Sequence, residues 1–424
     1  MSTSAVSMIV SNSQLEASDV TEPPILIIGN GVTGMHAARE LLRRKPTQPL
    51  VIFGEEPCQP YNRLKLSSLL AGKMDLAGVT TELAVNESSK VEQRHGYAIT
   101  RIDPAWRMVT DSSGKVLLYR KLILAMGSLP HHQNIAGNTL NGVFNFHTLS
   151  DAEKLIARRM RSRRTLIIGG GLLGLEAACG MQQAHTEVVI VDHADRLLNR
   201  QLDVEGSKRL LDYIESLGIG VLLNSAVKKI TGDDRVTGVE LYSGHTIACD
   251  TVIIAIGTVP NAGLAKASGI KTGKGIKVND VMQTSVPDIY AIGECAEHHD
   301  QVHGLVEPGL EQAEIAVDHL CGGSSRYQGF VESTTLKALG VNVFSVGPMA
   351  EPASSPLVKN HTYSSASIYR SIQVRRFRLL GAVAVGDWQE QNRVLEWVSK
   401  GRWIMPWQIW RFRNTGLLWR PQKR

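Results

Sequence analysis

The chain has 424 residues and a formal net charge of +6, and 43% of its residues are hydrophobic. This length suffices for two or three domains with substantial cores, and no apolar run is long enough to span a bilayer. Residues 1–23 are polar and serine-rich and lack the basic and apolar regions of a signal peptide, so we expect a disordered leader. The chain has five scattered cysteines without metal-binding spacing: Cys58, Cys179, Cys249, Cys295 and Cys321. This pattern argues against disulfides, an iron–sulfur cluster or any metal ligand, and a reducing compartment such as the cytoplasm is expected.

The first patterned stretch joins an apolar run, Pro24–Ile28, to the glycine motif G-x-G-x-x-G. Gly29, Gly31 and Gly34 are followed by helix-forming residues, the order of a buried strand, a tight turn and a helix N-terminus. Such a turn lets backbone N–H groups approach a pyrophosphate. An acidic residue is expected about 20 residues later to bind a ribose hydroxyl, and Glu55 supplies it. The alternative is a turn that serves packing only.

The connection after Glu55 carries two cations, Arg63 and Lys65, ahead of a short helical pattern. They fall at the sheet edge where open α/β proteins bind ligands. A cation there pairs with phosphate or lies near the electron-rich edge of a flavin ring. The alternative is an ordinary exposed basic pair. Cys58, in the same turn, has no second cysteine nearby and is expected to be inert.

Residues 97–119 alternate as three antiparallel strands around a turn at 112–114, which predicts a small accessory sheet. The chain then returns to an apolar run, Leu122–Pro130, that contains Gly127. The run Thr251–Pro260 repeats this arrangement with Gly257. Glycine at both exits allows close approach of a cofactor or of a crossing backbone.

The strand–turn–helix signature recurs 140 residues after the first. Gly169, Gly171 and Gly174 follow the apolar run 165–168, and a second strand ends at Asp192. Repetition of the complete unit predicts two dinucleotide sites with hydride transfer between their ligands. A carboxylate at Asp192 accepts the hydroxyls of an unphosphorylated ribose and repels a 2′-phosphate, which favours NADH over NADPH. Arg196, four residues later, weakens that preference.

Beyond the second unit, residues 286–292 form another apolar strand that stops at Gly293 and Glu294. A loop and a helix over 310–320 follow, and residues 334–387 alternate as strands of a small α+β domain. The predicted fold is therefore α/β, with two Rossmann-like dinucleotide-binding domains and a C-terminal α+β interface domain. The expected boundaries are 24–147 with 273–328 for the first, discontinuous domain, 148–272 for the second, 329–398 for the third and 399–424 for a basic tail.

The tail, 399–424, contains seven Lys and Arg and no acid, so the rest of the chain has a net charge of −1. Trp403, Trp407 and Trp410 share one helical face by spacing, and Pro406 limits the helix to about two turns. Three interpretations stay open. The tail is a surface for an acidic electron-acceptor protein, an interfacial membrane anchor, or tryptophans packed on the body beside solvated arginines.

Together these residues resemble the FAD-dependent reductases of the glutathione reductase fold. The resemblance is closer to the flavin-binding half of assimilatory NAD(P)H-nitrite reductase large subunits, covers residues 24–385, and depends on the stretches 61–72, 290–295, 304–309 and 335–347. Rubredoxin and ferredoxin reductases share the general plan. The paired cysteines of disulfide reductases are absent from the sequence.

The resemblance implies two sets of ligand contacts. Those for FAD are Gly29, Gly31, Gly34, Glu55, Arg63, Lys65, Ala98, Gly127, Gly293 and Glu294, the last standing where the family has aspartate. Those for NAD are Gly169, Gly171, Gly174, Glu176, Asp192, Arg196 and Gly257. Glu176 resembles a glutamate that reaches toward the nicotinamide; its alternative is a charge at a helix N-terminus. No catalytic acid or base is assigned, because hydride transfer requires none.

The expected function is an FAD-dependent NAD(P)H oxidoreductase that passes electrons to a separate redox protein. Candidate acceptors are a nitrite or nitrate reductase component, a rubredoxin or a ferredoxin. Nitrite reductase large subunits continue into a sirohaem domain with a cysteine cluster that this sequence lacks, so we expect a free-standing electron-entry module. The alternatives are an NADH oxidase that uses oxygen and a flavin-bound redox sensor or scaffold. We expect a homodimer or a hetero-complex, no nucleic-acid partner, and a cytoplasmic location, with the tail as the candidate contact to the inner membrane face.

Overall fold

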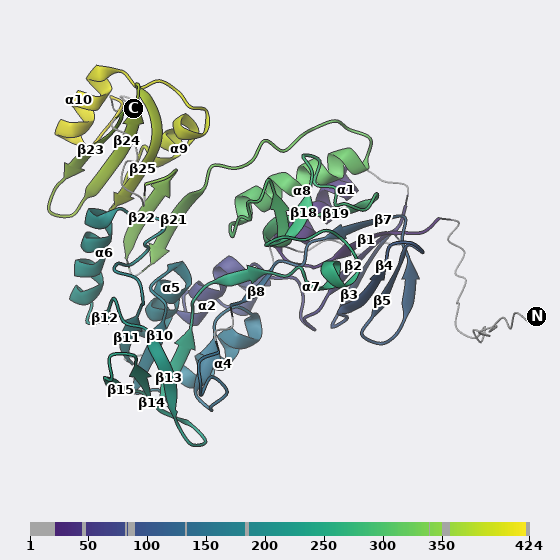
Figure 1. Ribbon diagram of the computed structural model, residues 1–424, viewed down its shortest axis with the longest axis horizontal. Coiled ribbons are helices and arrows are strands. Elements are labelled where there is room, and N and C mark those ends of the chain that lie inside the picture. The colour runs from purple at the N-terminus through teal and green to yellow at the C-terminus, as the bar shows by residue number, and fades with distance from the viewer. Residues whose placement is uncertain are drawn as a thin grey trace, which may run out of the picture.

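The structure is a computed structural model that describes residues 22–44, 48–80, 83, 90–131, 134–182, 186–338, 340–349 and 357–420. Nearly all of the expected leader, 1–23, therefore lies outside the described residues. Three units are visible in Figure 1: a first α/β unit on the right, a second below and to the left, and a C-terminal unit at the upper left. This arrangement confirms the predicted α/β fold with two parallel-sheet units and a smaller C-terminal domain.

The first unit is a five-stranded parallel sheet in the order β19-β7-β1-β2-β3, with bounds Ile289–Ala291, Lys121–Leu124, Ile25–Ile28, Leu50–Gly54 and Val91–His95. Ile25 and Ile27 of β1 pack on the helices α1 (Val32–Arg43) and α8 (Val306–Leu320). Leu26 and Ile28 face the accessory sheet β4-β5-β6 (Ile99–Asp103, Met108–Asp111 and Val116–Leu118). Both faces are covered, which explains why β1 is continuously apolar.

The second unit repeats this plan with the parallel order β12-β11-β10-β16-β9, with bounds Gly220–Leu222, Glu187–Val191, Arg164–Ile168, Thr251–Ile254 and Val143–Asn145. Ile167 packs toward helices α4 (Leu149–Arg159) and α5 (Leu172–Gln182). Its neighbours on β10 face the sheet β13-β14-β15 (Val227–Gly232, Val236–Leu241 and Thr246–Ala248). Smaller elements complete both units: η1 Arg63–Lys65, α2 Leu66–Leu70, α3 Leu76–Thr80, α6 Val204–Ser216, α7 Gly263–Ala267, β18 Ile276–Val278, η3 Gly293–Cys295 and β20 Ala296–His298.

Strand pairing and helix packing both join the first and second units. Strands β8 (Ser128–Pro130) and β17 (Thr258–Pro260) pair antiparallel directly after the exits of β7 and β16. Nearby, α2 packs on α5 so closely that a Cβ at Gly180 would lie 2.5 Å from a carbon of Leu70. Tyr61, buried in this interface, donates to the Glu56 carboxylate at 2.9 Å and accepts the backbone N–H of Leu149 at 3.0 Å.

The C-terminal unit is an antiparallel sheet in the order β21-β22-β25-β24-β23, with bounds Ser333–Ala338, Val341–Val346, Arg378–Val385, Tyr369–Arg375 and Val358–Ser364. Helices α9 (Gln391–Ser399) and α10 (Pro406–Thr415) cover it, and its other face continues the core of the second unit. Pro406 occupies the first turn of α10, where its missing N–H costs nothing. Pro406 begins a ten-residue helix and Trp403 precedes it, so the expectation that Trp403 shares one helical face with Trp407 and Trp410 is wrong.

Much of the basic tail takes part in this core. Ile404, Phe412, Leu418 and Trp419 pack with residues of β22, β24 and β25. Among the described residues, no helix combines the length and hydropathy needed to cross a bilayer.

We predict that Tyr61→Phe lowers the free energy of unfolding by about 1–3 kcal/mol, because it leaves the buried Leu149 N–H without its acceptor. The measurement is urea denaturation of the full chain. The control is Tyr97→Phe at an exposed position, expected within about 0.5 kcal/mol of wild type. Equal stabilities for Tyr61→Phe and wild type would contradict a role for this hydroxyl.

Candidate dinucleotide sites

The turn after β1 has three glycines with three different environments. Gly29 has φ +109°, and a Cβ there would overlap the Ala125 carbonyl oxygen. A Cβ at Gly34 would overlap the carbonyl oxygen of Gly29. Gly31, at the N-cap of α1, has an ordinary φ of −72°, and apart from its chain neighbours no atom lies within 4 Å of its Cβ position. The first and third glycines are therefore required by packing, whereas Gly31 borders open space.

In the turn after β10, too, the first and third glycines are required by packing and the second borders open space. Gly169 has φ +115° and faces the carbonyl oxygen of Ala255, and Gly174 faces that of Gly169. At Gly171, again, no atom apart from the chain neighbours lies within 4 Å of the Cβ position. In both turns the helix N-terminus is thus open to a ligand at the second glycine, which fits a pyrophosphate approaching free N–H groups.

The structure gathers most of the residues predicted for FAD at the carboxyl edge of the first sheet. Gly29 N–H donates to the Phe53 oxygen at 2.9 Å, so the turn lies beside the end of β2, where Glu55 is exposed. Tyr97 N–H donates to the Gly54 oxygen at 3.0 Å, which brings Ala98 to the same edge. The neighbouring strands β7 and β19 end there and lead to Gly127 and Gly293.

The two cations predicted to contact FAD have protein partners in this structure. Arg63 forms an ion pair with Glu56 at 2.9 Å and contacts His147 Nε2 at 2.9 Å. Lys65 donates to the Gly78 carbonyl oxygen at 3.2 Å. Their assignment to FAD therefore stays a prediction, and the structure adds a packing role at the junction of the units.

Several residues of this edge escaped sequence reasoning. The buried Gln312 of α8 accepts the Gly293 N–H at 2.8 Å. Ser128 donates its hydroxyl to Glu294, which orients the predicted carboxylate. Thr33 packs against Gly293 and Gly309, so α1, α8 and η3 meet beside the first glycine turn. These are single residues of common types, and no periodicity marks them.

The residues predicted for NAD lie at the carboxyl edge of the second sheet. Asp192 accepts the N–H groups of Gly170 at 2.5 Å and Ala194 at 2.8 Å, so its carboxylate is held against the glycine turn. Arg196 pairs with Asp195 at 3.0 Å and donates to the Asn199 oxygen at 3.3 Å. Its charge is thus partly balanced by a neighbour. Gly257 lies at the exit of β16 with φ +100°.

The exits of the two units are hydrogen-bonded across the junction. His131 N–H donates to the Gly257 oxygen at 2.9 Å, and Asn261 N–H donates to the Gly127 oxygen at 3.0 Å. The two predicted sites are therefore connected by backbone rather than by flexible loops.

Glu176 lies at this junction, on the second turn of α5 and opposite Ser67 of α2. Burial raises the pKa of Glu176 to about 7, and a hydrogen bond with Ser67 works in the opposite direction. A carboxyl group with such a pKa changes charge near neutral pH. Cys58 differs: burial and the charge of Glu56 raise the pKa of its thiol, consistent with an inert side chain.

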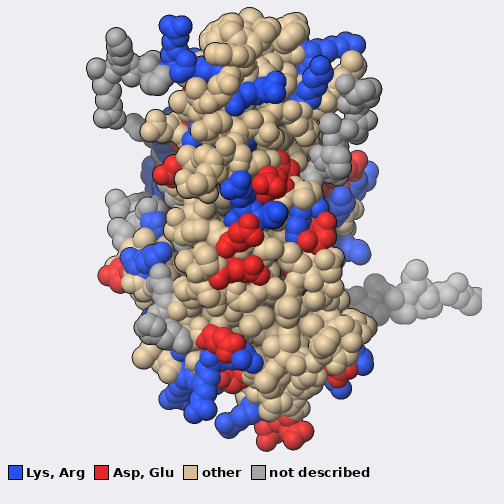
Figure 2. All heavy atoms as spheres, turned by 90° about the vertical axis from the view of Figure 1, so that its left-hand side faces the viewer, with Lys and Arg blue, Asp and Glu red and all other residues tan. Residues whose placement is uncertain are grey.

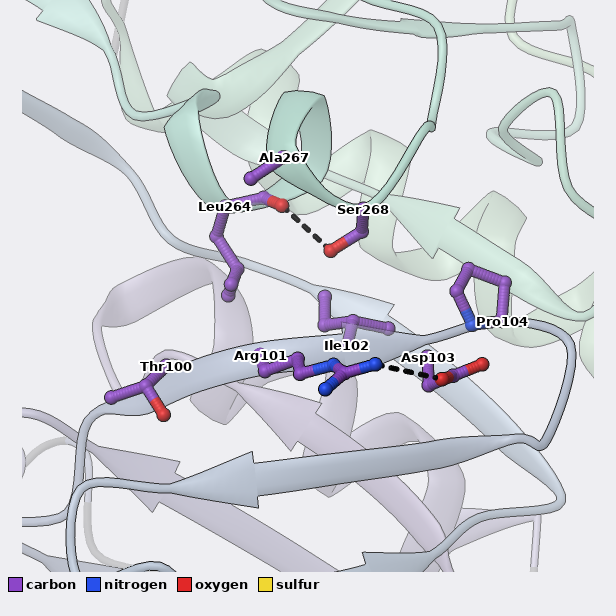
Figure 3. A pocket seen from close by; sticks show the side chains of 8 residues that line it. All are labelled: Thr100, Arg101, Ile102, Asp103, Pro104, Leu264, Ala267 and Ser268. Atoms are coloured by element: carbon purple, nitrogen blue, oxygen red, sulfur yellow. Dashed lines mark hydrogen bonds and ion pairs between the residues drawn. The ribbon is translucent and has the colours of Figure 1, made fainter. Parts of the chain in front are cut away.

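Two other features lie apart from these edges. A cavity of about 420 Å³ opens between β4 and α7, and Figure 3 shows the Arg101–Asp103 ion pair on its floor. Asp280, His298 and His299 form a group with metal-ligand chemistry among the described residues. The imidazole rings of His298 and His299 stack with 4.0 Å between their centroids, and both Nε2 atoms contact the same oxygen of Asp280. Stacked rings direct their nitrogens side by side, which suits a shared hydrogen-bond acceptor.

Comparison with known proteins agrees with this geometry. The family described as "Pyridine nucleotide-disulphide oxidoreductase" matches residues 23–319, and "Rubredoxin NAD+ reductase C-terminal domain" matches residues 333–402. From Bacillus subtilis (strain 168), the chain is similar to "Nitrite reductase [NAD(P)H]" (37% identity over 89% of this chain and 47% of the relative) and to "Assimilatory nitrate reductase electron transfer subunit" (34% over 89% and 49%). The chain spans about half the length of these relatives.

A solved structure extends the comparison. The reductase chain in "Crystal structure of the covalent putidaredoxin reductase-putidaredoxin complex" superposes with a TM-score of 0.82, at 25% identity over 91% of this chain and 95% of that chain. These findings confirm the resemblance to the flavin-binding half of nitrite reductases and to rubredoxin and ferredoxin reductases.

We predict that Gly31→Ala weakens binding at the first dinucleotide site only, and that Gly171→Ala weakens binding at the second site only. Each new methyl group enters open space, so the free energy of unfolding should change by less than about 1 kcal/mol. Gly31→Ala should weaken FAD binding at least about tenfold. Gly171→Ala should retain FAD and weaken NADH binding by a similar factor.

The matched control is Gly29→Ala, which must destabilise the fold because its methyl group overlaps Ala125. The measurements are flavin content, NADH titration and thermal denaturation of each variant. Normal FAD binding by a folded Gly31→Ala protein would contradict the assignment of the first turn.

The stability of the folded protein should depend on pH through Glu176. Because burial raises the pKa of Glu176 to about 7, the folded protein retains a proton that the unfolded chain releases near the ordinary glutamate pKa of 4.5. The folded state binds more protons in this interval, so stability falls as pH rises from about 4.5 to 7. Glu176→Gln should remove this component, and the stability difference between variant and wild type should grow with pH and level off above about 7.

Denaturant titrations of both proteins across this pH range measure that difference. A pH-independent difference would show that Glu176 does not titrate as the structure indicates.

Proposed function

Because the chain belongs to the pyridine nucleotide-disulphide oxidoreductase family, we propose that it is an FAD-dependent NADH oxidoreductase that delivers electrons to a separate redox protein. The observation that carries this proposal is the pair of matching glycine turns, each open at its second glycine and joined across the β8–β17 strand pair.

In this proposal the first turn binds the FAD pyrophosphate at Gly31, and Glu55 binds the adenosine ribose. Glu294, oriented by Ser128, contacts the polar part of the cofactor near Gly293. Bound FAD would supply the redox chemistry by accepting a hydride from NADH and releasing electrons singly. The residues of the chain supply orientation and electrostatics.

The second turn would hold NADH through Gly171, with Asp192 fixing the unphosphorylated ribose. The same carboxylate disfavours NADPH by charge repulsion. Glu176 faces the first unit at the junction, where the nicotinamide must meet the flavin. Its proposed role is to hydrogen-bond the nicotinamide and so set the position of the ring.

The acceptor is proposed from the relatives. One is named as an electron transfer subunit of assimilatory nitrate reductase, and a solved relative is a complex with putidaredoxin. We propose that this chain likewise forms a complex with a small redox protein or a reductase component in the cytoplasm. The surface near the junction is where such a partner would receive electrons.

Anaerobic stopped-flow mixing of the FAD-loaded protein with NADH or NADPH tests the proposal. NADH should bleach the flavin band rapidly, and NADPH should bleach it at least about tenfold more slowly at equal subsaturating concentration. Asp192→Ala should reduce this preference, whereas Asp212→Ala, at an exposed position of α6 in the same unit, should preserve it.

The reductase function and the role of Asp192 are tested by different outcomes. No bleaching by either nucleotide would overturn the reductase function. Equal rates with both nucleotides in the wild type would overturn only the role of Asp192.

A further inference from the structure

The C-terminal unit carries an exposed surface of large apolar side chains, which we name the aromatic–basic face. Its apolar members, with exposed fractions, are Phe377 (48%), Trp403 (56%), Met405 (48%), Trp407 (57%) and Trp410 (70%). Exposed arginines surround them: Arg375, Arg376, Arg378, Arg402 and Arg413. Figure 2 shows Lys and Arg flanking a rounded surface of uncharged residues at the top of the view, with acidic side chains lower down.

Local contacts hold the face together. Ile404 N–H donates to the Phe377 oxygen at 2.6 Å, and the Arg378 guanidinium lies 5.7 Å from the Trp403 ring centroid. The tip of the β24–β25 hairpin is therefore fixed beside the segment that enters α10. Within α10, Gln408 and Phe412 are buried, which turns Trp407 and Trp410 to the outside.

Other tryptophans of the C-terminal unit pack in its core, unlike the exposed tryptophans of the aromatic–basic face. Trp419 is buried, packs edge-to-face on Trp397 with 4.9 Å between centroids, and lies 4.2 Å from the Arg393 guanidinium. Trp388 is also buried in the core. The exposed tryptophans add little to this core, and large apolar side chains exposed on neighbouring segments indicate a binding function.

Charge identifies the binding partner. Residues 357–420 contain eleven Lys and Arg and three Asp and Glu, a formal charge of +8, which leaves −2 for the rest of the chain. One of the three acids, Glu396, is paired with Lys400 and Arg402. A positive surface with projecting tryptophans combines the two features that bind anionic lipid: attraction to headgroups and insertion of amphipathic rings at the interface.

We propose that the aromatic–basic face binds the surface of an anionic membrane. Helix α10, which carries Trp407 and Trp410, lies at the upper left of Figure 1, on the side of the C-terminal unit away from the junction of the dinucleotide units near β8. An electron acceptor must approach that junction, so this face suits attachment better than electron transfer. In this arrangement α10 lies in the membrane surface with Trp407 and Trp410 toward the lipid.

Co-sedimentation of the full-length protein with vesicles tests the proposal. Vesicles of phosphatidylglycerol and phosphatidylcholine should bind it, vesicles of phosphatidylcholine alone should bind at least about tenfold less, and added salt should weaken binding. Trp407→Ala/Trp410→Ala should reduce the partition coefficient at least about tenfold. Arg376→Gln/Arg378→Gln should reduce it about fivefold for each arginine removed.

The matched control is Trp106→Ala, which removes a tryptophan of 72% exposure from the accessory-sheet region and should bind vesicles like wild type. NADH oxidation with a soluble acceptor should be unchanged in the Trp407→Ala/Trp410→Ala protein. Equal binding to neutral and anionic vesicles, or undiminished binding by that variant, would overturn the proposal. Dimerisation that the variant abolishes, without vesicle binding, would instead assign the face to contact between copies of the chain.

Discussion

The architecture depends on a main-chain contact made twice: Gly29 against the Ala125 carbonyl and Gly169 against the Ala255 carbonyl. No side chain fits between these backbones, and both glycines have positive φ, so substitution is opposed by overlap and by conformation together. The contact fixes where each central strand ends relative to its neighbour. The open second glycines and the paired exits of β7 and β16 follow from that placement.

Sequence patterns identified the features that depend on neighbours along the chain. The glycine turns, the apolar parallel strands and the accessory sheet are of this kind, because turn chemistry and burial on both sheet faces leave a local record. The start of α10 was misjudged because Pro406 is compatible with a first turn as well as with a break. Gln312 and Ser128 could not be found, since their function arises only when η3 and α8 meet in space.

Arg63 shows what spacing alone does not reveal. Its sequence position predicts a phosphate or flavin contact, and the folded chain adds two protein partners, Glu56 and His147. Burial and the charge of Arg63 lower the pKa of His147, which keeps the imidazole neutral and able to accept. The same Nε2 lies 3.0 Å from the Ser128 oxygen, where it would have to donate. One nitrogen cannot do both, so Arg63 and the β8 backbone compete for it at the junction of the units.

The distribution of charge separates two tasks in space. In the proposed function, hydride and electron transfer take place at the junction, where Glu176 and the paired exits bring the two units together. The C-terminal unit carries more positive charge than the whole chain, and its tryptophans project from its outer surface. Attachment through the face would therefore leave the junction free, and the reductase could exchange soluble nucleotides and acceptors while held at a membrane.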